Sequence, residues 1–325
     1  MTLFDADIQE KLPGDLQSVA GLTYLMSFPG IGTARAIKLA EQFGSLSSLR
    51  KAPIDSVIKI TKQAGSAVHD SVEVDVPPLW LPDGMQAVCK FDIEWPKWAA
   101  TMGKDPPAIL YFRGTMPNIP CIAVVGTRQP TLFGQRAVQL LMPEIAAHGW
   151  GVVSGLALGV DTIAHEEALK ANVPTWAILG GGVDVPTPKD NLKLAERILE
   201  SGGGLISEQP PGSAPQPQSL VARNRLQVAA SEIVFAAQSG IPSGTLHTVR
   251  FAIEQERPLV VPRPIDKLIH EAQSAGNVAL TDPLGCDPSV LKATGALAVT
   301  VSGRHPVADL VVGSNNLGEI WQLKP

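Results

Sequence analysis

The feature that most constrains the fold of this 325-residue chain is a regular alternation of short apolar runs and helical segments between residues 121 and 262. Each run is long enough for one buried strand, and each segment between has the apolar spacing of an amphipathic helix. This alternation predicts an α/β fold, a parallel sheet with helices on both faces. We expect strands at 121–125, 151–153, 175–179, 204–206, 232–236 and 258–261, and helices at 134–148, 160–171, 190–201, 223–230 and 245–256.

Loops rich in glycine and serine follow five of these six expected strands, at 126–128, 154–155, 180–182, 207–212 and 238–245. Ligands of open parallel sheets bind outside the carboxyl ends of the strands, where these loops would converge. Glycine lets backbone amides approach a ligand closely, and the helix N-termini behind the loops favour anions. The sequence therefore predicts a phosphate-binding site at this edge.

The first 70 residues have a helical pattern that a Pro-Gly-x-Gly segment interrupts at residues 29–32 and that Gly44 ends. Two helices joined by a tight turn resemble a helix-hairpin-helix of the kind that grips DNA backbone. In that case Gly30, Gly32 and Arg35 contact the DNA backbone. The stretch between residues 30 and 65 contains six Lys/Arg and only two acidic residues. The alternative is a small helical domain that only packs or dimerises.

Composition shifts divide the chain into three parts. We expect a helical domain at 1–70, a Pro-rich, acidic linker at 71–84, and a Rossmann-like domain with a short C-terminal tail at 85–325.

The overall composition excludes several classes of protein. The net charge of −5 and the absence of a basic tail exclude a protein that binds nucleic acid through bulk charge, although a local basic pocket is compatible. The three cysteines lack metal-ligand spacing, so we expect no metal and no cofactor. The N-terminus has no apolar signal core, and no apolar run reaches the roughly 18 residues of a membrane span. We expect a cytoplasmic protein without a membrane partner.

A set of motifs in the second part of the chain resembles the DprA/Smf DNA-processing family over roughly residues 90–285. The matching segments are 105–114 (DPPAILYFRG), 124–128 (VVGTR), 133–134 (FG), 152–165 (VVSGLALGVDTIAH), 202–208 (GGGLISE), 223–225 (RNR), 243–246 (SGTL) and 257–262 (RPLVVP).

The resemblance implies an extended Rossmann-like domain that binds single-stranded DNA and protects it during uptake and transformation. It further implies a homodimer that loads a RecA-type recombinase, and a binding protein rather than an enzyme. The chain departs from the family at Thr187-Pro188, where Tyr-Pro is frequent, and at 219–222, which lacks an aromatic residue. We also expect the C-terminal winged-helix domain that many members carry to be lacking, since few residues follow Pro262.

With the family as context, we expect the phosphate and DNA contacts to come from the loops behind the strands. The expected residues are Gly126, Thr127, Arg128, Phe133, Ser154, Gly155, Gly181, Lys189, Asn191, Arg223, Asn224, Arg225, Ser243, Gly244 and Thr245.

Several of these residues have a structural alternative. Arg128 either grips a phosphate with its planar guanidinium or bridges to a neighbouring helix. Arg223 and Arg225 point about 100° apart on a helix, so we expect one to face the ligand and the other a structural acid. Phe133 either stacks on a base or anchors its loop.

The sequence also argues against catalysis. Ser154, Asp161 and His165 invite comparison with a catalytic triad, but without a nucleophile-elbow spacing we expect a capping Asp and a structural His. The 243–245 loop resembles that of lysine-decarboxylase-like nucleotide-binding proteins, yet Thr248 stands where the nucleotide-cleaving members have Glu. A nucleotide- or nucleotide-sugar-binding sensor or hydrolase, for instance in phage defence, remains the alternative function. A protein-interaction module that kept only the fold is a third.

Overall fold

A computed structural model describes residues 14–62, 68, 79–103, 105–265, 268–282 and 306–323. The chain divides into two compact units. The N-terminal unit comprises Met1–Leu81, Ala87–Trp95 and Lys104–Leu110, and the sheet unit comprises Pro82–Gln86, Pro96–Gly103 and Tyr111–Pro325. The expected linker falls mainly on residues outside the described ranges, and the three-part division of the chain stays a prediction.

The described part of the N-terminal unit contains four helices ahead of the sheet: α1 (Val19–Ser27), α2 (Thr33–Phe43), α3 (Leu46–Lys51) and α4 (Ile54–Thr61). The predicted turn separates α1 from α2, and Gly30 adopts a φ of 83° that favours glycine. Gly44 ends α2 as expected, with a φ of 68° and its N–H donating to the carbonyl of Ala40. The helical hairpin read from the sequence is therefore present.

The sheet has nine strands in the order β1-β2-β6-β5-β4-β3-β7-β8-β9. Their bounds are β1 (Met85–Cys89), β2 (Ile109–Gly114), β3 (Cys121–Gly126), β4 (Gly151–Ser154), β5 (Thr175–Ile178), β6 (Gly204–Ser207), β7 (Ile233–Gln238), β8 (Leu259–Pro262) and β9 (Leu310–Val312). All six predicted strands are confirmed to within two residues at each end.

The six predicted strands, β3 to β8, all pair in parallel as expected, and the sheet continues beyond them as a mixed sheet. Pairing is parallel from β6 through β9, but β2 pairs antiparallel with β6, with Tyr111 opposite Ser207. The strands β1, β2 and β9 lie outside the strand–helix repeat from which the sheet was read. A strand that is not joined to its neighbour through a crossover helix is free to run in either direction.

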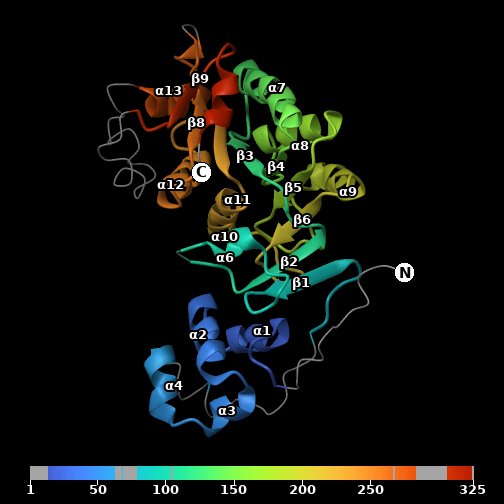
Figure 1. Cartoon of the computed structure of the whole chain (residues 1–325), viewed down its shortest axis with the longest axis vertical. Coiled ribbons are helices and arrows are strands. Elements are labelled where there is room, and N and C mark those ends of the chain that lie inside the picture. The colour runs from blue at the N-terminus through green and yellow to red at the C-terminus, as the bar shows by residue number, and fades with distance from the viewer. Residues whose placement is uncertain are drawn as a thin grey trace. The chain divides into compact units, whose positions relative to one another are not determined.

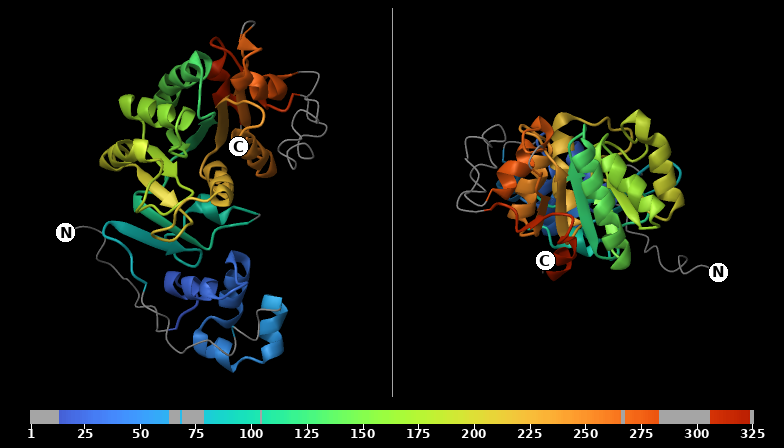
Figure 2. Two further views of the ribbon diagram at one scale, coloured as in Figure 1. Left: turned by 180° about the vertical axis from the view of Figure 1, so that it is seen from behind. Right: turned by 90° about the horizontal axis from the view of Figure 1, so that it is seen from above.

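Helices cover both faces of this sheet, as predicted (Figure 1; Figure 2). On one face, α7 (Leu132–Ala147), α8 (Val160–Lys170) and α9 (Leu192–Glu200) connect β3 to β4, β5 and β6 in turn. The other face carries α11 (Asn224–Ala229), α12 (Thr245–Glu254) and α13 (Ala275–Thr281), with α10 (Pro217–Ala222) directly before α11. The short α6 (Lys97–Ala100) lies between β1 and β2 in the chain.

The residues of β3 show how the two cores form. Ile122 and Val124 pack into the core beneath α7 and α8, whereas Ala123 and Val125 pack into the core beneath α12. Successive side chains of a strand point to opposite faces of the sheet. A strand covered by helices on both faces therefore needs apolar residues at every position, which appears in the sequence as a continuous apolar run.

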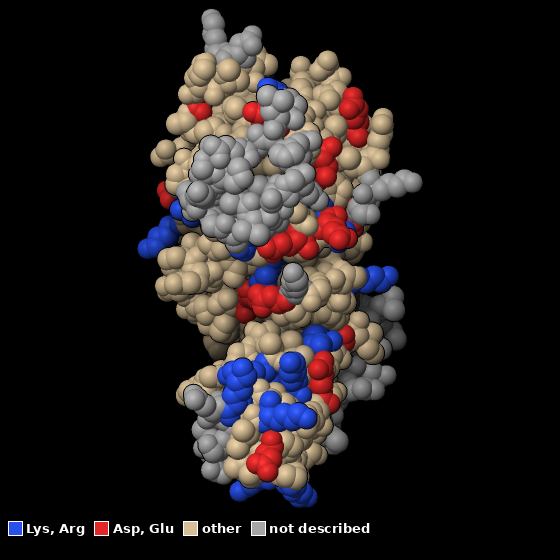
Figure 3. Space-filling model, turned by 90° about the vertical axis from the view of Figure 1, so that its left-hand side faces the viewer, with Lys and Arg blue, Asp and Glu red and all other residues tan. Residues whose placement is uncertain are grey.

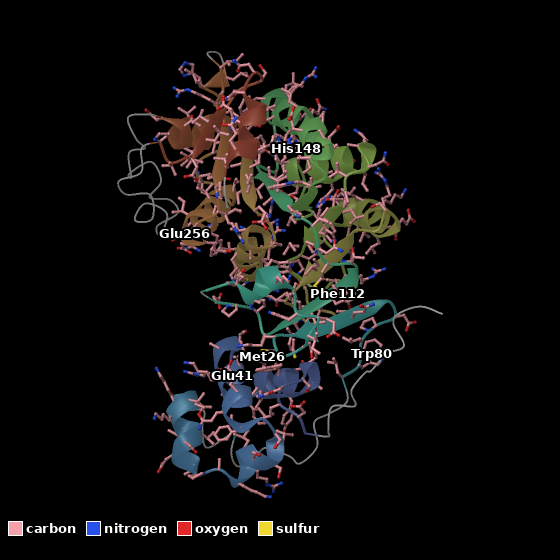
Figure 4. All side chains as sticks on the ribbon, viewed as in Figure 1. Met26, Glu41, Trp80, Phe112, His148 and Glu256 are labelled. Atoms are coloured by element: carbon pink, nitrogen blue, oxygen red, sulfur yellow. The ribbon has the colours of Figure 1, made fainter. Side chains whose placement is uncertain are left out.

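The last described residues pack against α7 of the sheet unit. The 3₁₀ helix η6 (Leu317–Gln322) buries Ile320 in the core shared with α7. The Trp321 ring stacks on His148 with ring centroids 4.0 Å apart, and its Nε1 donates to Glu144 Oε2. His148 directly follows α7 (Figure 4). In the described ranges, no helix combines the length and apolar character needed to cross a membrane.

Candidate nucleic-acid interface

The strand order reverses between β3 and β7. From β3 the chain adds β4, β5 and β6 on one side of β3, and it then returns to add β7 and β8 on the opposite side of β3. This topological switch point is where open α/β sheets bind ligands. The Thr127 N–H donates to the carbonyl of Gln238 at 2.8 Å, which joins the ends of the two strands. A Cβ on Gly126 would lie 2.5 Å from Val160 Cγ2, so glycine is needed there.

Arg128 follows at this point, and it is exposed to solvent. Gly159, at a φ of 84°, lies so close that a Cβ would come within 2.6 Å of the Arg128 carbonyl oxygen. The Val160 N–H also donates to the Thr127 carbonyl at 3.1 Å. Within the described residues, the Arg128 guanidinium forms no ion pair and no hydrogen bond, so the alternative of a salt bridge to a helix is not realised.

The fully buried amide of Gln238 ties the next loop to the same point. Its Oε1 accepts from the Thr131 N–H at 2.8 Å, and its Nε2 donates to Thr131 Oγ1 at 2.9 Å and to Ser274 Oγ at 2.8 Å. The predicted site residues did not include Gln238. A polar residue at the end of an otherwise apolar strand is the signal that could have revealed it.

Ser154 and Asp161 hold the loop after β4 in place through hydrogen bonds to the backbone. Ser154 Oγ donates to the Val124 carbonyl at 2.7 Å, and the Ala157 N–H donates to Asp161 Oδ2 at 3.3 Å. Burial raises the pKa of Asp161, and the nearby Arg223 charge opposes that rise. The helix α8 begins after Gly159 without a side-chain cap, and Asp161 accepts from the loop before the helix, so the capping function expected from the sequence is not observed.

His165 is fully buried, with its Nδ1 2.7 Å from Thr175 Oγ1. Burial lowers the pKa of His165 to about 3, with a smaller contribution from the Arg223 charge. Its hydrogen-bond partner is Thr175 rather than Asp161 or Ser154, so the three residues do not form a catalytic triad.

Arg223 lies beneath this loop and is 7% exposed. Its Nη1 donates to the Ile178 carbonyl at the end of β5, and its Nη2 lies 3.7 Å from Asp161 Oδ2. A methyl group on Gly155 would overlap the guanidinium. Arg223 therefore braces the ends of β4 and β5 and the start of α8.

Arg225 is also buried, and its guanidinium donates to both carboxylate oxygens of Glu208 at 2.7 Å. We expected one arginine of this motif to face a ligand, but in the structure each is opposite a carboxylate. The side chain of Asn224 between them is buried as well. The reason is that α10 and α11 turn this motif inward under the strand ends rather than toward solvent.

Asn191 links the loop before α9 to the loop before α8. Its Nδ2 donates to the Leu156 carbonyl and to Thr162 Oγ1, both at 2.8 Å. Lys189, two residues earlier, is exposed. Gly181 is buried, and a Cβ there would lie 2.8 Å from the Ser213 carbonyl oxygen.

The remaining predicted residues lie at helix starts. Phe133 is half-buried in the first turn of α7, which leaves its two alternatives open. In the loop before α12, the Thr245 N–H bonds to Ser243 Oγ at 3.2 Å, while Gly244 is exposed. Thr248 is buried, 2% exposed, at the position that lacks the hydrolases' Glu.

The predicted residues thus separate into two groups. Arg128, Lys189 and Gly244 are exposed, and Gly126, Thr127, Phe133 and Ser243 are half-buried, so these can meet a ligand. The others are buried supports: Ser154, Gly155, Gly181, Asn191, Arg223, Asn224, Arg225 and Thr245.

In the N-terminal unit, Gly30 and Gly32 are exposed at the turn, and Arg35 Nη1 donates to the Gly30 carbonyl. Lys38, Arg50, Lys51, Lys59 and Lys62 are exposed. Lys and Arg side chains gather on the face of this unit seen in Figure 3. The face is thus suited to contact with a polyanion.

Two further features bear on cofactors. Within the described ranges, no group of His, Cys, Asp or Glu has the geometry to hold a metal ion. A hollow of about 700 Å³ lies at the ends of β8 and β9, lined among others by Arg263, Ile265 and Asn316, and none of the predicted site residues lines it.

Comparison with known proteins matches residues 86–283 to the family described as DNA recombination-mediator protein A. The chain is 32% identical over 214 residues to the DNA processing protein DprA of Bacillus subtilis, covering 63% of this chain and 71% of that protein. It is 34% identical over 191 residues to protein Smf of Escherichia coli, covering 57% of this chain and 50% of that protein.

Two solved structures resemble this one. DNA processing protein A from Helicobacter pylori, whose single-stranded DNA binding mode has been described, is 31% identical with a TM-score of 0.52, covering 60% of this chain and 86% of that one. DprA from Streptococcus pneumoniae, at 22% identity and a TM-score of 0.65, covers 79% of this chain and 90% of that one and shows the same fold.

Proposed function

This chain belongs to the DNA recombination-mediator protein A family, and from that premise we propose that it binds single-stranded DNA at the carboxyl edge of its sheet. The observation that carries the proposal is Arg128, an exposed residue without an ion-pair partner in the described residues, whose backbone packs against Gly159 at the switch point. A planar guanidinium held in this way suits a phosphate oxygen pair. Exposed Lys189 adds a second cation two loops away.

Binding by this site is directed at the backbone and tolerant of sequence. The buried supports Asn191, Arg223 and Gln238 hold the loops at fixed positions rather than reading bases. With a net charge of −5, the chain attracts DNA through local cations rather than through its overall charge.

The experiment that tests this proposal is a fluorescence-anisotropy titration with labelled single-stranded oligonucleotides of increasing length, a matched duplex and a mononucleotide. We expect affinity to rise with length and the duplex to bind more weakly. Saturation of the site by a mononucleotide, with no gain from longer strands, would favour the nucleotide sensor instead and contradict a DNA-binding function.

We further propose that the chain works as a homodimer and passes the bound strand to a RecA-type recombinase in DNA uptake or transformation, as the family resemblance implies. We also propose that it has no hydrolase activity of its own, because Thr248 replaces the acid and His165 is held neutral. Turnover of DNA or nucleotides by the pure protein that Asp161→Ala abolishes would contradict this.

A further inference from the structure

Exposed aliphatic side chains collect at the carboxyl edge of the sheet. Among the described residues of the sheet unit, seven large hydrophobic side chains are exposed, and six of them follow the carboxyl end of a strand. Those six are Leu132, Leu158, Val185, Leu192, Ile265 and Ile269, and the exception is Leu140 within α7. Exposed apolar side chains scattered singly need no explanation, but a collection at one edge marks an interaction surface.

Three leucines of this set stand at the amino ends of neighbouring helices, and we refer to them as the leucine row. Leu132 is the first residue of α7, Leu158 precedes α8 by two residues, and Leu192 is the first residue of α9. Their side chains are 74%, 44% and 40% exposed. Packed helices lie about 8–10 Å apart, so the row extends over roughly 20 Å of this edge.

The loops that carry the row are joined by direct contacts. Gly159, next to Leu158, abuts the Arg128 carbonyl, and the Leu156 carbonyl accepts from Asn191 Nδ2 at 2.8 Å. The two outer leucines each have a cation close by in sequence: Arg128 lies four residues before Leu132, and Lys189 lies three residues before Leu192. Leu158, between them, lies next to Gly159, which abuts the backbone of Arg128. Lys189, like Arg128, has no ion-pair partner in the described ranges.

We infer that the leucine row is a platform for the bases of the bound strand, an inference that rests on the DNA-binding function proposed above. Cations beside apolar side chains match the chemistry of an unpaired strand, which carries phosphates on one side and the apolar faces of bases on the other. Aromatic rings usually supply such a platform. Here aromatic residues make up 5% of the chain, and aliphatic side chains take that role.

This arrangement selects single strands through the bases themselves. In a duplex the base faces are covered by stacking and pairing, so the leucines have nothing apolar to contact. The cations still meet duplex phosphates, because the backbone charge is present in both forms. Selectivity for single strands is therefore assigned to the leucines, and salt-dependent affinity to the cations.

The test compares an ordinary single strand with one of equal length whose nucleotides are abasic. We expect the wild-type protein to bind the ordinary strand about tenfold or more tightly, since contact with apolar side chains adds to the phosphate contacts. The triple variant Leu132→Ser/Leu158→Ser/Leu192→Ser should bind both strands with similar affinity. Its affinity for the abasic strand and its salt slope should match the wild-type values.

The matched control is Leu140→Ser, which removes a leucine about as exposed as Leu158 and Leu192 from a position two turns into α7. It should keep the wild-type preference for the ordinary strand. A triple variant that retains this preference, or that loses affinity for both strands equally, would overturn the inference. Wild-type protein that binds the two strands equally well would overturn the base platform alone, whereas wild-type protein that binds neither would overturn the DNA-binding function and the platform together.

Discussion

The arginines at the carboxyl edge of the sheet have two different environments. Arg223 and Arg225 are buried opposite Asp161 and Glu208, and Arg128 is exposed without such a partner in the described residues. Removing one member of a buried ion pair leaves the other charge unpaired, which costs stability. Removing an exposed arginine has little effect on folding, so only Arg128 permits a clean test of binding.

We predict that Arg128→Ala weakens binding of single-stranded DNA about tenfold, because it loses one charge-assisted phosphate contact on an exposed surface. The salt slope should fall by about 0.7, the value expected for one phosphate on a single strand. Arg128→Lys is the control and should restore the slope more than the affinity, because a point charge lacks the planar fork. A salt titration measures both, and wild-type affinity and slope in Arg128→Ala would contradict the assignment.

His165 makes the stability of the protein depend on pH. Its pKa is about 3 in the folded chain and 6.5 ordinarily, so between these values the unfolded chain binds a proton that the folded chain does not. This contribution to stability is complete above the ordinary pKa and is lost as the pH falls, by about 1.4 kcal/mol per pH unit. Between about pH 7 and about pH 5, the loss due to His165 should be about 2 kcal/mol.

The variant His165→Asn, which keeps a polar side chain but cannot titrate in this range, should lose about 2 kcal/mol less than the wild type over the same interval. Urea unfolding at the two pH values gives both free energies. The comparison uses the change with pH, so a lower absolute stability of the variant does not affect it. Equal losses in the two proteins would show that His165 is not the group responsible.

At the scale of elements, helix α2 shows why two glycines of similar surroundings differ. Gly32 at its start has a φ of −89°, and Gly44 at its end has a φ of 68°, and a Cβ at either would meet open space. Steric clash therefore plays no part, and only the backbone conformation separates them.

We predict that Gly44→Ala lowers the free energy of unfolding by about 1 kcal/mol, because a residue with a Cβ is strained in the left-handed region. Gly32→Ser is the control at the other end of the same helix and should cost nothing measurable, because Gly32 is the N-cap in extended backbone, which serine adopts without strain and caps at least as well as glycine. Urea unfolding of the two variants measures the difference. Equal effects would show that the helix does not end in the left-handed conformation.

At the scale of the whole molecule, we predict that the N-terminal unit adds only modestly to DNA binding. Reversing the charge of the exposed Lys38 and Lys59 should weaken binding of single-stranded DNA less than fivefold, in line with surface contacts that salt screens. Anisotropy titrations beside Arg128→Ala make the comparison. A larger loss than that of Arg128→Ala would identify this unit as the main DNA site.

The second prediction at this scale concerns assembly. We expect light scattering at micromolar concentration to give twice the 34.3 kDa mass of one chain, with the sheet unit forming the interface. A variant without the N-terminal helices would show whether they contribute. A single-chain mass for the wild type would contradict the homodimer.

The sequence by itself determined the six strands and five of the six α-helices of residues 121–262, missing α10, as well as the hairpin of α1 and α2 and the edge of the sheet that carries the loops. These features follow from local periodicity and from glycine and proline at fixed positions, which the neighbouring residues do not override.

Only the tertiary structure decided which residues of the loops face solvent. Arg128 and Arg223 look alike in sequence, yet one is exposed and the other is covered by Gly155 and opposite Asp161. The antiparallel β2 and the leucine row were likewise out of reach of local patterns. Burial depends on which distant segments pack against a residue, and that information lies in contacts between strands and helices far apart in the chain rather than in the residues beside it.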